Sequence, residues 1–189
     1  MAGLIPVIFP SVSTFLTFAS SKEVEFTVPP ISLENCKSFN KYSICGPNNL
    51  QKLIIPVNEN GKETQIADLT INYSVKWIRE HKNALQTAYG KSPFYEFYDY
   101  RFFALFDTQF EKLIDLNMAI WQQLCREFHV HENSNPLVNS EMPNLIDTIN
   151  IPVYPQVFAD RHGFQSNVSC LDLLFNLGPL SHDYIKTSL

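Results

Sequence analysis

Residues 108–128 read TQFEKLIDLNMAIWQQLCREF and contain the clearest helical pattern of the chain. Apolar side chains recur at intervals of three and four residues, the spacing that places them on one face of a helix. Thr108 and Glu111 have the spacing of a capping box, which satisfies free N–H groups where a helix starts. We therefore predict a long helix that starts at Thr108 and packs an apolar stripe against the core. The stripe consists of Phe110, Leu113, Ile114, Trp121, Leu124 and Phe128, with Asn117 as its polar exception.

Helices are also predicted on both sides of this one. Upstream, residues 74–90 predict a helix that Ser74 caps and Gly90 ends. Its inner face is formed by Trp77, His81, Leu85 and Ala88. A very aromatic helix is then predicted from Ser92-Pro93, because proline suits the first helical position. Downstream, Ser169 and Asp172 form a second capping box, and Gly178-Pro179 predicts the end of that last helix.

The first part of the chain has the patterns of short strands. Residues 4–9 and 24–28 are apolar or β-branched, and Ser11 is a candidate cap for a helix between them. The order strand, helix, strand predicts a βαβ unit. Further strands are predicted at 53–57 and 66–71.

These patterns predict an α/β or α+β fold. We expect a small mixed sheet from the N-terminal half, covered by helices, with a Rossmann-like layout as the preferred detail. The length of 189 residues favours one domain over residues 1–189, with a sheet-rich part at 1–73 and a helix-rich part at 74–189. Gly46-Pro47-Asn48-Asn49 is a turn signal within the first part.

Charge argues against a nucleic-acid partner. The net charge is −5 and no run of Lys or Arg occurs, whereas binding to phosphate backbones requires clustered cations. An anionic small molecule is still possible as a ligand, because a few local donors suffice for it. The sequence does not predict the oligomeric state.

The cysteines and the N-terminus point to a reducing compartment. None of the four cysteines forms a Cys-x-x-Cys pair, so we expect buried free thiols and no zinc site. The apolar N-terminus has no positive charge before Lys22, and Pro6 and Pro10 interrupt it, which argues against a secretion signal. No apolar run is long and regular enough to span a bilayer. We expect a cytoplasmic protein.

Familiar catalytic and metal motifs are scarce. The chain has six glycines and lacks a glycine-rich phosphate loop and a Gly-x-Ser-x-Gly elbow. His129 and His131 have a spacing that some metal sites use. Both also follow a predicted helix C-terminus, where a positively charged imidazole is mildly favoured. We therefore interpret them as residues at a helix end and expect no metal.

Residues 153–179, VYPQVFADRHGFQSNVSCLDLLFNLGP, place many polar side chains beside an apolar helix. The start of a helix presents free N–H groups and suits an anion. For His162 and Asn167, a ligand-binding role and a bracing role stay open. For Ser169 and Asp172, capping is favoured. His81 lies on an apolar helix face, where a core histidine with one hydrogen bond is the more common case.

These residues resemble the WbqC-like protein family. The resemblance rests on Tyr154-x-Gln156, on HGF at 162–164, on Asn167 and Ser169, and on DLLFNLGP at 172–179. The helix with Trp77, His81, Leu85 and Tyr89 and the segment LIIPV at 53–57 are also similar to family patterns. Two departures stand out. The first strand-to-helix turn lacks the family's polar groups, and Asn40-Lys41 replaces an Arg-rich run.

The resemblance implies a transferase in surface-polysaccharide (O-antigen-like) biosynthesis, with acyl or aminoacyl transfer to an amino sugar as the suggested reaction. It implies a nucleotide-activated sugar as substrate and leaves any cofactor unknown. His162 or His81 would be the base. The substrate-binding residues would be Asn40, Lys41, Tyr154, Gln156, Asn167, Ser169 and Asp172.

The alternative is a non-catalytic binding or scaffold protein that shares the fold. The missing polar groups of the first turn favour it. This alternative predicts a groove lined by aromatics such as Tyr95, Tyr98 and Tyr100, with the polar loop residues used in internal hydrogen bonds.

Overall fold

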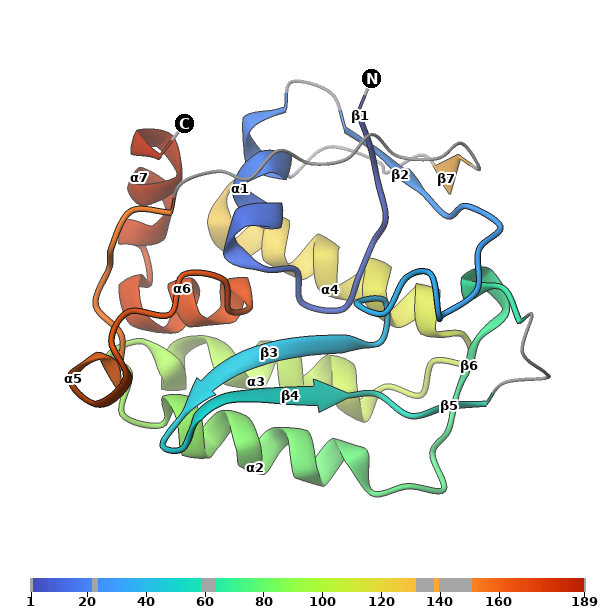
Figure 1. The fold of residues 1–189 in the computed structure, drawn as a ribbon, viewed down its shortest axis with the longest axis horizontal. Coiled ribbons are helices and arrows are strands. Elements are labelled where there is room, and N and C mark those ends of the chain that lie inside the picture. The colour runs from blue at the N-terminus through green and yellow to red at the C-terminus, as the bar shows by residue number, and fades with distance from the viewer. Residues whose placement is uncertain (1, 22–23, 59–63, 132–137, 140–150, 189) are drawn as a thin grey trace.

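The computed structural model describes residues 2–21, 24–58, 64–131, 138–139 and 151–188. Its first part is the predicted βαβ unit (Figure 1), made of β1 (Ala2–Leu4), α1 (Val12–Ser20) and β2 (Val24–Thr27). β1 and β2 pair in parallel, and β7 (Val138–Asn139) adds to β2, also in parallel. The Oγ atom of Ser11 accepts from the N–H of Thr14, so this predicted cap is confirmed. The predicted strand at 4–9 is wrong except at Leu4, because β1 covers Ala2–Leu4 and Pro6 cannot donate to a ladder.

A hairpin follows, with β3 (Lys41–Gly46) paired antiparallel to β4 (Asn49–Ile54). The predicted turn at 46–49 is therefore confirmed. The predicted strands at 53–57 and 66–71 are wrong in detail. Pro56 separates β4 from β5 (Val57–Asn58), and Ile66–Asp68 is a 3-10 helix before β6 (Thr70–Ile71).

The mixed α and β class is confirmed, although the strands are divided among separate sheets. Among the described residues, β1-β2-β7, β3-β4 and β5-β6 form three small sheets, which does not confirm a Rossmann-like layout. The helices after the hairpin are α2 (Trp77–Tyr89), α3 (Tyr95–Asp107), α4 (Leu113–Phe128), α5 (Ala159–His162), α6 (Cys170–Leu177) and α7 (Leu180–Thr187). In Figure 1 the hairpin lies next to α2, and the β1-β2-β7 sheet is drawn at the top of the view, away from α2.

Two predicted helix caps differ from the structure. α4 begins at Leu113 with Lys112 as its N-cap, and the Oγ1 atom of Thr108 instead donates to the carbonyl of Ala104 at the end of α3. Ser74 bonds to Asn72 and does not cap α2. The predicted inner face of α2 is confirmed, because all four of its members are buried.

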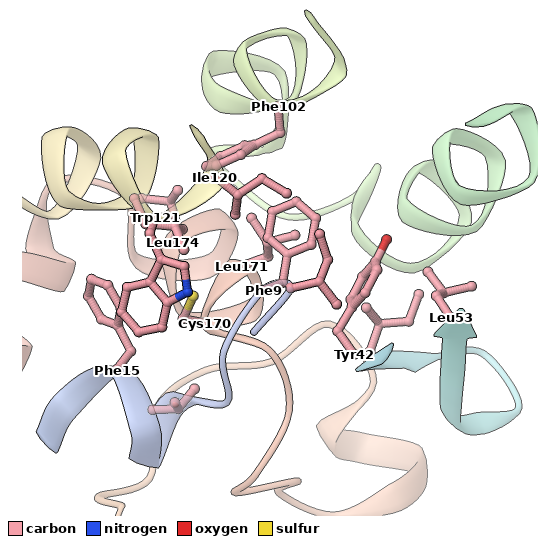
Figure 2. Packing of buried hydrophobic residues seen from close by; sticks show 14 of the residues in the cluster. Phe9, Phe15, Tyr42, Leu53, Phe102, Ile120, Trp121, Cys170, Leu171 and Leu174 are labelled. Carbon is pink, nitrogen blue, oxygen red and sulfur yellow. The ribbon is translucent and has the colours of Figure 1, made fainter. Parts of the chain in front are cut away.

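α4 organises the core (Figure 2). Trp121 is fully buried against the rings of Phe15, Phe18 and Phe26, with centroid distances between 4.9 and 6.0 Å. The Nε1 atom of Trp121 donates to the carbonyl of Val7 at 2.9 Å. The helix therefore combines a large apolar contact with a polar connection to the loop after β1.

The four cysteines are buried, as predicted. Within the part of the chain that the structure describes, no helix is long and apolar enough to cross a membrane.

Candidate functional site

The polar loop near the end of the chain closes around a buried carboxyl group. Asp172 lies in the first turn of α6 and is 1% exposed. The Nε2 group of Gln156 donates to Oδ1 of Asp172 at 2.8 Å and to the carbonyl of Gln165 at 3.0 Å. The Oε1 atom of Gln156 accepts from the N–H of Gln165 at 2.9 Å. Both ends of the Gln156 amide are thus bonded to the chain.

Tyrosines complete the surroundings of this carboxyl group. Tyr154 is buried against the rings of Phe164 and Tyr184, and its hydroxyl accepts from Gln156 at 3.3 Å. The hydroxyl of Tyr89, from α2, lies beside Asp172, but it forms no hydrogen bond of normal geometry. The cluster therefore connects the loop, α6 and α2.

Burial dominates the electrostatics of the cluster. It raises the pKa of Asp172 from its ordinary value of 3.8 to about 6, and hydrogen bonds, among them those of Tyr154 and Gln156, oppose the rise. No described Lys, Arg or His side chain forms an ion pair with Asp172. Burial also raises the pKa of Tyr154 well above its ordinary value, so this hydroxyl stays protonated.

Ser169 and Asn167 brace the entry into α6. The Oγ atom of Ser169 accepts from the N–H of Leu171 at 3.2 Å, and this predicted cap is confirmed. The N–H of Ser169 donates to the carbonyl of Ser43 at 2.8 Å, and the carboxyl group of Asp172 bonds to Gln156. The Asp172 half of the predicted capping box is therefore wrong. Asn167 is exposed, and its Oδ1 atom accepts from the hydroxyl of Ser13 at 2.9 Å.

His162 is the last residue of α5 and is half-buried. Its Nε2 atom lies 2.9 Å from the carbonyl of Pro47, in the turn of the hairpin. Because a carbonyl can only accept, the neutral ring carries its proton on Nε2, and Nδ1 is the basic nitrogen. Gly163 follows with φ of +69°, a left-handed value that favours glycine.

His81 lies elsewhere, in the core beside Trp77 and Phe106. Its Nε2 atom donates to the carbonyl of Ile54, and its Nδ1 atom accepts from the hydroxyl of Tyr42, each at 3.1 Å. Burial lowers the pKa of His81 to about 4. Both ring nitrogens are therefore engaged and the ring is neutral at pH 7.

Asn40 and Lys41 lie near His81, at the open end of the hairpin. Asn40 is buried, and its Nδ2 group donates to the carbonyl of Ile55 at 3.0 Å. Lys41 begins β3 opposite Ile54, the residue that His81 contacts. His162 contacts the turn at the other end, about 17 Å away for a strand of this length. The structure thus divides the predicted site residues between the two ends of the hairpin.

A groove of about 740 Å³ lies between α3 and α4, next to the turn from α6 to α7. Its described lining residues are Phe94, Glu96, Phe97, Tyr98, Tyr100, Arg101, Gln123, Arg126, Glu127, His129 and Pro179. Phe97 and Tyr100 are 65% and 57% exposed. The predicted residues Tyr98 and Tyr100 line the groove, whereas Tyr95 is buried in the core.

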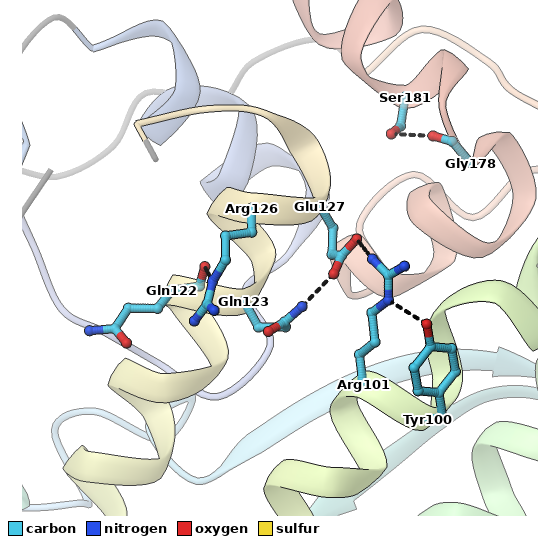
Figure 3. A network of polar contacts seen from close by, with 8 residues as sticks. All are labelled: Tyr100, Arg101, Gln122, Gln123, Arg126, Glu127, Gly178 and Ser181. Carbon is cyan, nitrogen blue, oxygen red and sulfur yellow. Dashed lines mark hydrogen bonds and ion pairs between the residues drawn. The ribbon is translucent and has the colours of Figure 1, made fainter. Parts of the chain in front are cut away.

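A polar network crosses this groove (Figure 3). Arg101 of α3 pairs with Glu127 of α4, and Gln123 donates to the other carboxylate oxygen of Glu127. The Nε group of Arg101 donates to the hydroxyl of Tyr100 at 3.0 Å. The sequence interpretation missed this network, although Gln123 and Glu127 have the i, i+4 spacing of neighbours on a helix face.

His129 and His131 do not form a metal site with other described residues, since no described group of three or more His, Cys, Asp or Glu could hold an ion. His129 ends α4 in the left-handed conformation and lines the groove. The Nε2 atom of His131 lies 3.2 Å from the carbonyl of Phe18.

The model of the WbqC-like protein family matches residues 31–146, more than half of the 189-residue chain. The predicted family is therefore confirmed. The match ends before the loop with Tyr154, Gln156 and His162, so the C-terminal part of the resemblance stays a prediction. Neither the comparison with curated proteins nor the comparison with solved structures finds a match.

Proposed function

Because this chain belongs to the WbqC-like protein family, we propose that it is a cytoplasmic transferase of bacterial surface-polysaccharide (O-antigen-like) biosynthesis. The proposed reaction is the transfer of an acyl or aminoacyl group to the amino sugar of a nucleotide-activated substrate. The observation that carries the catalytic part is the contact of His162 with Pro47, because it fixes the ring and leaves Nδ1 as the basic nitrogen.

In the proposed step, the amine nitrogen of the sugar attacks the carbonyl carbon of the donor and forms the new bond. Nδ1 of His162 accepts the proton that this nitrogen loses. The bond between the carbonyl carbon and the leaving group then breaks. The leaving group departs with the electron pair and takes the proton back from the imidazolium.

The neighbours of His162 have different parts in this proposal. Asn167 is exposed and can present its amide NH₂ group to a sugar hydroxyl, as predicted. Tyr154, Gln156 and Asp172 already bond to one another, so we assign them to holding the loop in place. Ser169 caps α6. These assignments refine the predicted roles.

The residues at the open end of the hairpin are not used in the same step as His162. His81 has a lowered pKa and two engaged nitrogens, which makes it a poor base at pH 7. Asn40 and Lys41 share that end of the hairpin. Their roles in phosphate or oxyanion binding stay predictions.

The test is the substitution His162→Gln. Glutamine can still donate to the carbonyl of Pro47 but cannot act as a base, so the loop is kept while the chemistry is removed. With nucleotide-activated amino sugars and acyl or aminoacyl donors, we expect the transfer rate to fall by roughly 10²- to 10⁴-fold.

A matched control is His182→Gln. His182 is also half-buried, and its Nδ1 atom also lies close to a carbonyl, that of Phe128, at 3.0 Å. The control should transfer at the wild-type rate. Full activity of a folded His162→Gln protein would remove His162 from the mechanism.

The non-catalytic alternative is favoured by one arrangement. The side-chain amide of Gln156 forms hydrogen bonds within the chain, and an aromatic groove is open between α3 and α4. Both features are ones that this alternative predicts. A folded wild-type protein that binds a sugar yet transfers nothing from any donor would favour it.

A further inference from the structure

The groove between α3 and α4 is separate from the surroundings of His162. None of its described lining residues is among the residues predicted for the transferase site, and His162 instead contacts Pro47 and Phe158. Its walls are connected, since α3 and α4 pack together and the Arg101–Glu127 pair joins them across the groove. Its volume lies within the range of small-molecule sites.

Exposed rings form the apolar part of the groove. Phe97 and Tyr100 leave more than half of their surfaces in solvent, and Phe94 and Tyr98 lie beside them. Exposed aromatic rings gathered in one groove offer flat apolar faces to a ligand. A sugar ring has such a face, made of its axial C–H groups.

The polar part is balanced in charge. Two arginines, Arg101 and Arg126, and two glutamates, Glu96 and Glu127, line the groove. Guanidinium groups only donate hydrogen bonds and carboxylates only accept them, whereas a hydroxyl does both. A ligand with many hydroxyls can therefore use both kinds of group. An anionic ligand would meet Glu96 and Glu127, and a cationic ligand would meet the two arginines.

Part of this polar surface is held in position before any ligand arrives. The guanidinium of Arg101 lies 5.4 Å from the ring centres of both Tyr98 and Tyr100. Glu127 is nearly buried, with a side chain that is 6% exposed, and Arg101 and Gln123 bind it from two sides. Fixed donors and acceptors lower the entropy cost of binding.

We propose that this groove binds an uncharged saccharide, with its rings against Phe97 and Tyr100 and its hydroxyls on Glu96, Arg101 and Arg126. This goes beyond the transferase proposal and does not depend on His162. It makes the groove a second ligand site, suited to a short stretch of glycan.

The experiment uses the full chain and uncharged trisaccharides of glucose, mannose and N-acetylglucosamine, with trigalacturonate as the anionic comparison. Binding is followed by saturation-transfer NMR and calorimetry. We expect saturable binding of at least one uncharged trisaccharide, and weaker binding of trigalacturonate. Phe97→Ala and Tyr100→Ala should each weaken binding about tenfold, because each removes one ring face.

Controls separate this site from folding and from catalysis. Leu50 on β4 is 54% exposed and lies outside the groove, so Leu50→Ala should bind like wild type. Equal melting temperatures should show that Phe97→Ala and Tyr100→Ala are folded. His162→Gln should keep the binding, so a failure of the transferase proposal would leave this inference intact.

Three results would overturn the inference. The first is no saturable binding of any uncharged trisaccharide to the folded wild type. The second is binding that Phe97→Ala and Tyr100→Ala leave unchanged, or that trigalacturonate matches. The third is self-association that Phe97→Ala abolishes, because a second copy of the chain would then cover the groove.

Discussion

Asn117 lies among the apolar residues of α4 and joins two loops to that helix. Its Nδ2 group donates to the carbonyl of Pro6 at 2.8 Å and to the carbonyl of Phe39 at 3.0 Å. Asn117 and Phe39 are fully buried, and a carbonyl left without a partner there cannot bond to water. The polar exception in the stripe is therefore a connection between the βαβ unit and the segment before β3.

We expect Asn117→Leu to lower the free energy of unfolding by roughly 3 kcal/mol, since it removes both donors and leaves the carbonyl of Pro6 buried without this partner. Urea denaturation measures this. The matched control is Gln122→Leu, an exposed amide on the same helix, which should change stability by less than about 0.5 kcal/mol. Equal effects of the two substitutions would contradict the role given to Asn117.

Histidines show how one residue type takes different roles. His81 follows the helical period of α2 into the core, where burial lowers its pKa to about 4. His162 follows no period and is placed by Pro47 at the hairpin turn. The sequence could identify both as candidates, but only tertiary contacts separate them.

At the scale of elements, local signals were the ones that predicted well. The caps Ser11 and Ser169 and the inner face of α2 depend on residues close together in the chain. The predicted cap at Thr108 was wrong because its hydroxyl bonds instead to a carbonyl of the preceding helix. The bounds of the short strands were predicted poorly, because strands of two or three residues have too little pattern to specify their ends and partners.

For the candidate site too, contacts between residues close in sequence could be predicted, and contacts between distant segments could not. Tyr154, Gln156 and Asp172 are close in sequence and do come together. Lys41 and His162 are separated because Lys41 begins β3 and His162 contacts Pro47 beyond its other end, and the sequence does not show this placement. Arg101 and Glu127 meet only because α3 packs against α4.

The loop and α6 are joined through Asp172, and this connection depends on pH. The folded pKa of about 6 lies above the ordinary value of 3.8, so folding favours the protonated form. Its contribution to stability is complete below pH 3.8 and is lost as pH rises through 6. His81 has the opposite slope, because its lowered pKa contributes stability above pH 6.5 that is lost as pH falls through about 4.

Comparing wild type with Asp172→Asn isolates the first slope, since His81 is present in both proteins. From pH 4 to pH 7, we expect wild type to lose up to roughly 3 kcal/mol relative to Asp172→Asn in urea denaturation. Asp183→Asn changes an exposed position of α7, and its free energy of unfolding should depend on pH as that of wild type does. A parallel curve for Asp172→Asn as well would mean that Asp172 does not titrate differently in the folded state.

At the scale of the whole molecule, buried residues from both halves of the chain form a continuous cluster, from Leu4 to Ile185. This supports the proposal that residues 1–189 fold as one domain. The hairpin crosses the molecule within this arrangement and carries Pro47 to α5 at one end and Lys41 to α2 at the other. The placement of His162 is thus a consequence of the overall fold.

The most direct test of the catalytic proposal is the protonation state of that ring. Proton–nitrogen NMR correlation spectra of the His162 imidazole, assigned with His162→Gln, report which nitrogen carries the proton in the neutral form. We expect the proton on Nε2, with Nδ1 unprotonated and its signal shifting when an amino-sugar substrate is added. A neutral ring with its proton on Nδ1 would show that the Pro47 contact does not hold and that Nδ1 cannot be the base.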